Sequence, residues 1–540
     1  MIRFIERSFV DSRAARRSFL LVLLLMTALR AVLAARLPIT GDEAYFLYWG
    51  RYPDWGFYDH PPMVGWWLAA LDAVSSHLFV LRLPALLVVP VVAMIGWQLL
   101  RRHGEALAWT GATLLLLVPL NAWNVAITTD IPLMFFSALT VWLYLRACRS
   151  GRSLDYLLTG LALAGALLSK YFAGLLALAI FAHAVSRPGR GRFVGLAWVV
   201  AGALPAAIVQ IVWNAQNCWP NVMFNLINRN ETAGWSWQSP PLYAFCVAYV
   251  LTPAVAWRLL RPKIDPGSTL APASASAPPS APASALASTP MPSPAGTAAD
   301  DRRALQWLAA VPFLLFAALS LVKTIGLHWL ASFVLPAVAA YMLGASRRAQ
   351  ARALAFAGLF AAAHWLLIGI ISVLPTETFK SWRSYPGLVM TVHGDELSAA
   401  LAPYRGRFAI ASDGYSPAVT MGYNLGEYVF VFGPGSSHAR HDDILTDFRR
   451  LEGRDILVVL RTPPALDEAY RPYFESVQTR RIEIRGAAFH LVEGRGFRYE
   501  TYRDRVLDEV RRRYYAVPSW LPPGACYFCD RYFPERACHR

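Results

Sequence analysis

The apolar segment SFLLVLLLMTALRAVLAA at residues 18–35 runs directly into the polar segment RLPITGDEAYFLYW at residues 36–49. The first segment has the length of about 20 residues that crosses a bilayer. Three arginines within residues 13–17 precede it, and basic residues beside a first span hold that end of the chain in the cytoplasm. The sequence therefore predicts a transmembrane helix that delivers Asp42 and Glu43 to the opposite face of the membrane.

The composition of the chain predicts an integral membrane protein. Hydrophobic residues make up 56% of the 540 residues, charged residues 16%, and the mean hydropathy is +0.36. The formal net charge is +16, but the basic residues lie largely in short clusters between apolar runs, as the positive-inside rule requires. Nucleic acid is therefore excluded as a partner. A signal peptide ending near Ala34 is a rival interpretation of the first span, but the many later spans favour an uncut anchor.

The basic clusters fit on one face of the membrane only if an even number of spans separates them. Together with the span at residues 18–35, this placement of the basic clusters predicts about eleven transmembrane helices. It also predicts that residues 1–17 are cytoplasmic and that the residues after Pro375 lie on the outer face. Residues 154–186 could instead form one long tilted helix, and residues 61–78 predict a helix that lies along the membrane surface. The further spans that we expect are residues 83–100, 105–121, 131–147, 154–169, 171–186, 193–212, 241–260, 304–322, 327–344 and 353–374.

Two segments differ in composition from the rest of the transmembrane domain, which we place at residues 18–375. Residues 265–303 are rich in Ala, Ser and Pro, cannot bury a core, and predict a disordered cytoplasmic linker within that domain. Residues 376–540 predict a soluble α/β or α+β domain, because their apolar runs shorten to strand length and alternate with helical stretches. The strand-length runs and helical stretches include residues 408–411, 456–460, 442–451 and 502–513.

Reactive and polar side chains gather in the segments expected on the outer face. Carboxylates, amides, aromatic rings and isolated cations together suit a sugar and a lipid phosphate. Lys170, Arg229 and Lys323 lie where the positive-inside rule disfavours cations, so an anionic partner would explain them. Ordinary alternatives remain open: solvated loop charges at a helix end, a helix N-cap, or residues that anchor the interface. The candidate residues are Asp42, Glu43, Tyr45, Tyr58, Asp59, His60, Asp130, Lys170, Trp213, Asn214, Arg229, Lys323 and His328.

Five motifs follow one another in the segments expected on the outer face: Asp42-Glu43, Tyr58-Asp59-His60-Pro61-Pro62, Thr129-Asp130, Leu168-Ser169-Lys170-Tyr171 and Trp213-Asn214. Together they resemble the GT-C glycosyltransferases, specifically family 39. The resemblance extends to its bacterial relatives that use polyprenyl-phosphate sugars, such as the aminoarabinose transferase of lipid A and the galacturonic acid transferases of lipopolysaccharide core. It covers about residues 15–375. Departures from the family pattern are His60, where lipid A relatives tend to have lysine, and Tyr45, where some have arginine.

The resemblance implies an inverting transfer of a sugar to a lipid or cell-envelope glycan at the periplasmic face of a bacterial inner membrane. A protein acceptor is the less favoured alternative. Asp42 would be the general base, Glu43 would position it, and Asp130 would orient hydroxyls. Lys170, Lys323, His60 and His328 would neutralise the lipid phosphate that leaves. Expected partners are the donor, the acceptor and membrane lipids, and a divalent ion such as Mg²⁺ or Mn²⁺ held by Asp42 and Glu43 is a candidate cofactor.

Other interpretations remain open on the sequence alone. A transporter or flippase of lipid-linked sugars is the main alternative, although such proteins usually contain internal repeats. A membrane-anchored binding protein whose soluble domain is the active part is a third. Near the C-terminus, Cys526, Cys529 and Cys538 with His539 have spacing that allows a zinc site, whereas an oxidising outer location favours a disulfide.

Overall fold

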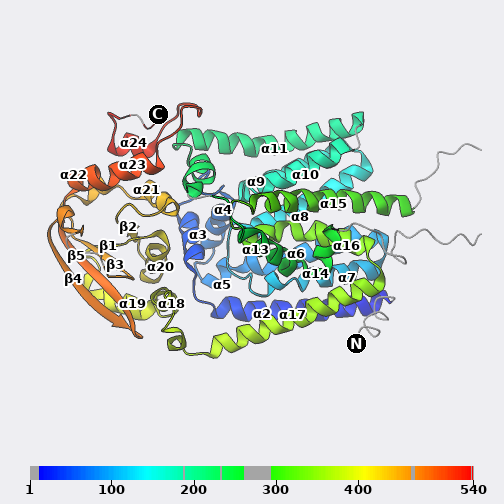
Figure 1. The fold of residues 1–540 in the computed structure, drawn as a ribbon, viewed down its shortest axis with the longest axis horizontal. Coiled ribbons are helices and arrows are strands. Elements are labelled where there is room, and N and C mark those ends of the chain that lie inside the picture. Colours follow the sequence, from blue (N-terminus) through cyan, green and yellow to red (C-terminus); the bar gives the residue numbers. More distant parts are fainter. Residues whose placement is uncertain are drawn as a thin grey trace, which may run out of the picture.

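The computed structural model describes residues 11–186, 189–231, 234–260, 294–463, 469–536 and 538. A bundle of long helices lies beside a domain that contains a five-stranded sheet (Figure 1). The described residues do not include residues 1–10, residues 265–293 of the expected linker, or His539.

The bundle contains both long and short helices, and the short helices α3 (Gly41–Arg51) and α4 (Met63–Asp72) lie next to the sheet domain (Figure 1). The first begins at the cap Asp11, whose side chain accepts a hydrogen bond of 2.8 Å from the N–H of Arg13. In chain order the helices are α2 (Ser12–Arg36), α3 (Gly41–Arg51), α4 (Met63–Asp72), α5 (Leu78–Leu81), α6 (Leu83–Leu100), α7 (Glu105–Leu116), α8 (Asp130–Ser150), α9 (Ser153–Ser169), α10 (Ala173–Ser186), α11 (Arg190–Gln216), α12 (Pro220–Val222), α13 (Ser239–Leu251), α14 (Pro253–Leu260), α15 (Pro294–Leu319), α16 (Val334–Gly344) and α17 (Arg347–Val373).

Seven helices in the described chain are long and apolar enough to cross a membrane, and an eighth span counts if the bent pair α13 and α14 is one. Three shorter apolar helices, α7, α9 and α10, accompany them. A helix, or in one case a bent pair of helices, lies at each expected span, so the prediction of a polytopic α-helical membrane protein is confirmed. The helix expected along the surface is α4, which has 10 residues and is too short to cross a bilayer.

The structure corrects two expected segments and decides a third. Residues 241–260 are not one straight span, because the axes of α13 and α14 differ in direction by 114°. Thr252 has a φ of 69° and is followed by Pro253. The positive φ ends α13, and the proline starts α14. The linker is shorter than expected at its end, since α15 already begins at Pro294. The segment at 154–186 forms two helices that separate at Lys170 rather than one tilted helix.

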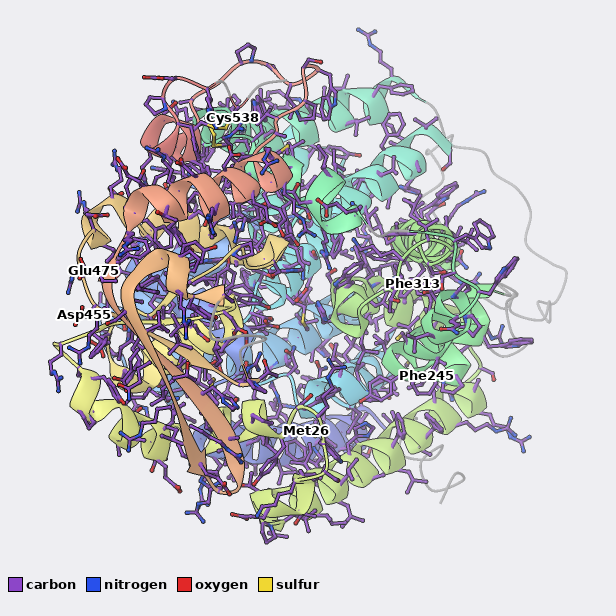
Figure 2. The ribbon with its side chains drawn as sticks, turned by 60° about the vertical axis from the view of Figure 1, so that its left-hand side comes forward. Met26, Phe245, Phe313, Asp455, Glu475 and Cys538 are labelled. Carbon is purple, nitrogen blue, oxygen red and sulfur yellow. A yellow bond between two sulfur atoms is a disulfide. The ribbon has the colours of Figure 1, made fainter. Side chains whose placement is uncertain are left out.

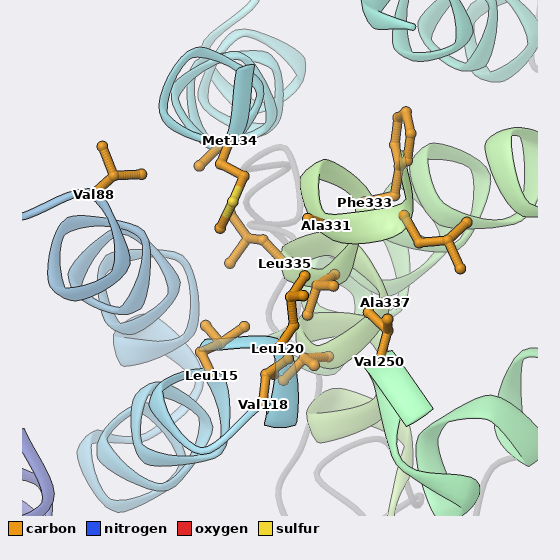
Figure 3. Close-up of a cluster of buried hydrophobic side chains, with 14 of the residues drawn as sticks. Val88, Leu115, Val118, Leu120, Met134, Val250, Ala331, Phe333, Leu335 and Ala337 are labelled. Carbon is orange, nitrogen blue, oxygen red and sulfur yellow. The ribbon is translucent and has the colours of Figure 1, made fainter. Parts of the chain in front are cut away.

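Close packing in the bundle depends on small and complementary side chains. A methyl group at Gly160 of α9 would lie 2.9 Å from the Cα of Gly202 in α11, so the two backbones meet where neither residue carries a side chain, as is common between membrane helices. Elsewhere, side chains from several helices interlock. Figure 3 shows such a cluster, with Val88, Leu115, Met134, Phe333 and Leu335 converging from different parts of the chain.

The C-terminal domain is built on a mixed sheet with the strand order β2-β1-β3-β5-β4. β1 pairs in parallel with β2 and β3, and β5 pairs antiparallel with β3 and β4. The expected strands near 408 and 456 are β1 and β3, and a π turn interrupts the helix expected at 502–513. The elements are β1 (Ala409–Ser412), β2 (Phe430–Val431), β3 (Ile456–Leu460), β4 (Phe474–Ile484), β5 (Ala487–Phe497), α18 (Tyr385–Val392), α19 (Gly394–Leu401), α20 (Tyr415–Leu425), α21 (Asp442–Leu445), α22 (Tyr499–Tyr502), α23 (Asp508–Tyr514) and α24 (Tyr527–Tyr532).

Disulfides fasten the C-terminal tail, and one of them reaches the helical bundle. Cys218, in the loop after α11, pairs with Cys526, and Cys529 pairs with Cys538. Figure 2 places Cys538 beside the red C-terminal helices, far from Met26 in the bundle. The structure therefore supports the disulfide interpretation of the tail rather than a zinc site, and it adds Cys218, which the sequence left unassigned.

Candidate active site

Asp42 and Glu43 occupy the first turn of α3, and the side chain of Thr40 caps that helix. Their side chains have different environments. Glu43 is buried and accepts two hydrogen bonds from Arg82, at 2.8 Å from Nε and 2.5 Å from Nη2, and a third from the N–H of Ile127 at 3.1 Å. Glu43 thus fixes α3 to the bundle, and its expected catalytic role stays a prediction.

Asp42 faces the C-terminal domain. Its side chain is exposed, and Oδ1 accepts a hydrogen bond of 3.0 Å from the hydroxyl of Tyr415, the first residue of α20. Burial and the neighbouring carboxylate raise the pKa of Tyr415, so its hydroxyl remains a donor. Within the described residues Asp42 has no other hydrogen bond or ion pair. Its second oxygen therefore stays accessible to a ligand.

Asp59 is a buried carboxylate surrounded by imidazoles. Oδ2 lies 3.2 Å from Nδ1 of His60, and Oδ1 accepts a hydrogen bond of 3.4 Å from the hydroxyl of Tyr45. Burial alone would raise the pKa of Asp59, but His60, with His438 and His441 of the C-terminal domain, more than offsets this and holds that pKa below its usual range. Asp59 therefore remains ionised, and it engages two of the residues expected to bind substrate.

Asp130 and Lys170 form a buried ion pair at the start of α8. The Nζ atom of Lys170 lies 2.9 Å and 3.0 Å from the two oxygens of Asp130. Nε2 of His328 lies 4.0 Å from Oδ2 of Asp130, and that imidazole is 54% exposed. Since the pair neutralises itself, the position of Lys170 needs no external anion. His328 is the member of this group that remains open to a ligand.

Two further cations lack a carboxylate partner within the described chain. The guanidinium of Arg229 lies 5.0 Å from the ring centre of Trp329, and Nζ of Lys323 donates a hydrogen bond of 2.5 Å to Oδ1 of Asn230. Burial and the nearby Arg229 lower the pKa of Lys323 to about 8, and burial lowers the pKa of Arg229 as well. Cations that repel one another and have no counter-ion form an arrangement suited to an anionic ligand.

A continuous path of contacts links the exposed carboxylate to these cations. Each neighbour along the path contacts the next through a hydrogen bond, a ring contact, a cation–π contact or an ion pair. The groups therefore form one site at the junction of the bundle and the C-terminal domain. In order, the path is Asp42, Tyr415, His438, Phe224, Arg229, Trp329, Phe172, Lys170 and Asp130.

Three residues expected to bind substrate have structural partners instead. Trp213 is buried and donates a hydrogen bond of 3.0 Å to Asp54. Asn214 exchanges hydrogen bonds with Asn221, which in turn donates one of 2.8 Å to the carbonyl of Tyr58. These contacts fasten the loop after α11 onto the first loop. Trp213, Asn214 and Tyr58 thus help to shape the site, and substrate binding by them stays a prediction.

Sequence reasoning missed the contribution of the C-terminal domain. Tyr415, His438 and His441 all lie against the first loop: His438 packs on Tyr415, and Nδ1 of His441 accepts a hydrogen bond of 3.4 Å from the N–H of Tyr58. Burial lowers the pKa of His441 to about 4, so that ring is neutral. The only signal in the sequence was the pair of histidines three residues apart.

The residues proposed to hold a divalent ion do not fit that purpose. Both oxygens of Glu43 already accept hydrogen bonds from Arg82, so Glu43 cannot join Asp42 as a ligand. Among the described residues, the only close group of metal-ligand side chains is Cys526, Cys529 and Cys538. These cysteines are in disulfides.

Comparisons with known proteins agree with the arrangement of the helices. Residues 59–213 match the family described as dolichyl-phosphate-mannose-protein mannosyltransferase. The chain is 27% identical over 197 residues to the lipid A galacturonosyltransferase RgtD of Rhizobium johnstonii, a match that covers 35% of this chain and only 39% of RgtD. It superposes on the crystal structure of ArnT from Cupriavidus metallidurans in the apo state with a TM-score of 0.53 and 14% identity, covering 88% of this chain and 97% of ArnT.

At 14% identity the likeness to ArnT concerns the fold alone, whereas the family match and RgtD relate the sequence to glycosyltransferases. The helical bundle with its sheet-containing C-terminal domain is compatible with these matches. The chain thus resembles the polytopic membrane glycosyltransferases of the GT-C type, through a match to the mannosyltransferase family at residues 59–213 and a partial similarity to RgtD.

Proposed function

We propose that this protein transfers a sugar from a polyprenyl-phosphate donor to a lipid or glycan acceptor of the cell envelope. The observation that carries the proposal is the exposure of Asp42. By contrast, Glu43 and Asp130 are buried in ion pairs, and Asp59 is buried beside His60. The accessible carboxylate suits a general base. The cations at the other part of the same path of contacts suit a phosphate site.

The chemical step follows from these positions. Asp42 accepts the proton of the acceptor hydroxyl as the oxygen of that hydroxyl attacks the anomeric carbon of the donor. The bond from the anomeric carbon to the phosphate oxygen breaks, and the polyprenyl phosphate leaves with the bonding electrons. Arg229 and Lys323, assisted by His328, offset the charge that develops on that phosphate. A single displacement of this kind inverts the anomeric centre.

We place this chemistry on the periplasmic face of a bacterial inner membrane. Arg13, Arg16 and Arg17 in the first turns of α2 favour a cytoplasmic N-terminus. α2 then leads across to α3, which carries Asp42 and lies on the side of the C-terminal domain (Figure 1). The cysteine pairs of the tail support the same orientation, because disulfides persist in the oxidising periplasm. The proposed order of domains is residues 1–17 inside, 18–375 in the membrane and 376–540 outside.

The phosphate site can be tested without knowing the sugar. Purified protein is titrated with undecaprenyl phosphate, and bound lipid is measured by native mass spectrometry. We expect the double variant Arg229→Gln/Lys323→Gln to bind at least about tenfold more weakly, since each charge-assisted contact contributes on this order. The matched control is Arg513→Gln, which removes an exposed cation that pairs with Glu231.

Unchanged binding in Arg229→Gln/Lys323→Gln, with a stable fold, would exclude these cations as the phosphate site. The flippase alternative is separated by a second measurement. Cells that lack the protein should lose a sugar from an envelope glycan; accumulation of a lipid-linked sugar with no change in any glycan would support transport instead.

A further inference from the structure

Four cysteines meet where the C-terminal tail contacts the helical bundle, and Figure 2 labels one of them, Cys538. The Sγ atom of Cys538 lies 3.4 Å from Sγ of Cys526, although each sulfur is bonded to a different partner: Cys538 to Cys529, and Cys526 to Cys218. The sulfur atoms of Cys526, Cys529 and Cys538 all lie within 4.8 Å of one another. The two disulfides are therefore in direct contact, and a thiolate released from one already touches the other.

Two of these cysteines have the spacing of a redox motif. The sequence Cys526-Tyr527-Phe528-Cys529 separates its cysteines by two residues, as in proteins that exchange disulfides with thiols. In the structure the two cysteines of the motif are bonded to different partners rather than to each other. The motif thus connects two disulfides that can exchange partners.

The two disulfides differ in their surroundings. The outer disulfide, Cys529–Cys538, closes a short segment in which residues 534–536 are exposed. The inner disulfide, Cys218–Cys526, joins the tail to the loop after α11, where the neighbouring Trp219 is buried. A reductant that approaches from solution therefore meets the outer disulfide first.

The loop after α11 is strained at the inner disulfide. Cys218 and Trp219 have φ values of 68° and 52°, in the left-handed region that residues other than glycine rarely adopt. The tail supports this conformation, because the N–H of Cys218 donates a hydrogen bond of 2.9 Å to the carbonyl of Ala525, and Nε1 of Trp219 donates one of 2.9 Å to the carbonyl of Pro522. Relaxation of this backbone favours exchange in the direction that frees Cys218.

The same loop also holds the first loop of the bundle in place. Asn221 donates hydrogen bonds of 2.6 Å and 2.8 Å to the carbonyls of Phe57 and Tyr58, and Asn228 donates one of 2.8 Å to the hydroxyl of Tyr58. Freeing Cys218 from the tail therefore loosens the support of the backbone next to Asp59. This effect reaches the site of the proposed function, whereas the exchange itself does not depend on that function.

We propose that the tail is a thiol–disulfide exchange site, which a protein dithiol reduces at the outer disulfide and which passes the electrons to the inner disulfide. A thiolate of the dithiol attacks Cys529, and its second thiol resolves the mixed disulfide, so that the dithiol loses two electrons and two protons. The thiolate of Cys538 then attacks Sγ of Cys526. A bond forms between Cys526 and Cys538, the bond between Cys218 and Cys526 breaks, and its electron pair goes to Cys218. The product has one disulfide, and the thiols of Cys218 and Cys529 hold the two electrons and two protons.

Peptide mapping without reduction follows the exchange in the full-length protein. The protein in nanodiscs is treated with limiting dithiothreitol as the dithiol, and free thiols are alkylated with N-ethylmaleimide at intervals. We expect an early species in which Cys526 is bonded to Cys538 while Cys218 and Cys529 are alkylated. Hydrogen exchange of the backbone amides in residues 217–231 should become faster in that species. Independent loss of the two disulfides, with no bond between Cys526 and Cys538 at any time, would overturn the proposal.

Variants separate this relay from direct reduction of the inner disulfide. In Cys529→Ser/Cys538→Ser the dithiothreitol must attack the inner disulfide itself, so alkylation of Cys218 should be at least about tenfold slower than in the natural protein, where the neighbouring thiolate acts intramolecularly. Cys529→Ser leaves a free thiol at Cys538, and part of that variant should contain the Cys526–Cys538 bond and a free Cys218 without any reductant. The control Cys246→Ser changes a free cysteine of α13 and should behave like the natural protein. Equal rates of Cys218 alkylation in the natural protein and the double variant, or fully bonded Cys218 in Cys529→Ser, would each contradict the relay.

Discussion

The hydroxyl of Tyr415 lies 3.0 Å from Oδ1 of Asp42, two residues that are 373 positions apart in the chain. This contact ties the first turn of α3 to the first turn of α20 and holds the exposed carboxylate in one orientation. The C-terminal domain therefore takes part in building the proposed active site, rather than covering it at a distance.

Tyr415→Phe removes that hydrogen bond while keeping the ring. We expect kcat for sugar transfer to fall by about tenfold, the change that corresponds to about 1.4 kcal/mol of lost transition-state stabilisation, with little change in the affinity for polyprenyl phosphate. Tyr423→Phe, a change on the same helix, is the control. Parallel losses of kcat and donor affinity in Tyr415→Phe would instead indicate a disturbed fold.

Glu43→Gln leaves Arg82 buried without its anion. Breaking a buried ion pair in this way costs about 3–5 kcal/mol, and we expect a lower midpoint of thermal unfolding in detergent. The control is Glu231→Gln, whose exposed ion pair with Arg513 should contribute at most about 1 kcal/mol. If Glu43→Gln keeps its stability but loses transfer, Glu43 has the catalytic role that its contacts argue against.

Cys218→Ser removes the disulfide that joins the loop after α11 to the tail. Loss of a native disulfide typically costs about 2–5 kcal/mol, so the free energy of unfolding should fall. Reducing agent should destabilise the natural protein more than it destabilises the variant. Cys246→Ser changes a free cysteine and is the control. Equal sensitivity of Cys218→Ser and the natural protein to reductant would argue against the Cys218–Cys526 pair.

Binding of polyprenyl phosphate should weaken as the pH rises through about 8. Burial lowers the pKa of Lys323 to about 8, so the side chain is a cation below that pH and neutral above it, and its attraction for phosphate is lost on the alkaline side. Lys323→Arg keeps the charge at all these pH values and should remove the decline. A decline that persists unchanged in Lys323→Arg would show that another group titrates.

The transmembrane architecture was predictable because it depends on local composition. Runs of apolar residues and short basic clusters determine the spans, and each expected segment has a helical counterpart. The bend at Thr252 and Pro253 was not anticipated, although proline following a polar residue was visible in the sequence. Length and hydropathy alone do not reveal a change of helix direction.

The site was only partly predictable, because the roles of its carboxylates depend on distant partners. Asp42 and Glu43 are neighbours with the same chemistry, and only the position of Arg82 shows that Glu43 is buried in an ion pair. The contributions of Tyr415 and His438 could not be inferred, since the spacing of His438 and His441 alone does not show that their domain docks on the first loop.

Asp42 as the catalytic base is tested most directly by mass spectrometry of envelope lipids and glycans from cells that lack the gene, complemented with the natural protein, Asp42→Asn or Glu231→Gln. We expect a glycan to lose a sugar on deletion and to regain it with the natural protein and Glu231→Gln, but not with Asp42→Asn, although that variant is inserted and folded to the same level. Full restoration by Asp42→Asn would contradict the assignment of Asp42 as the base.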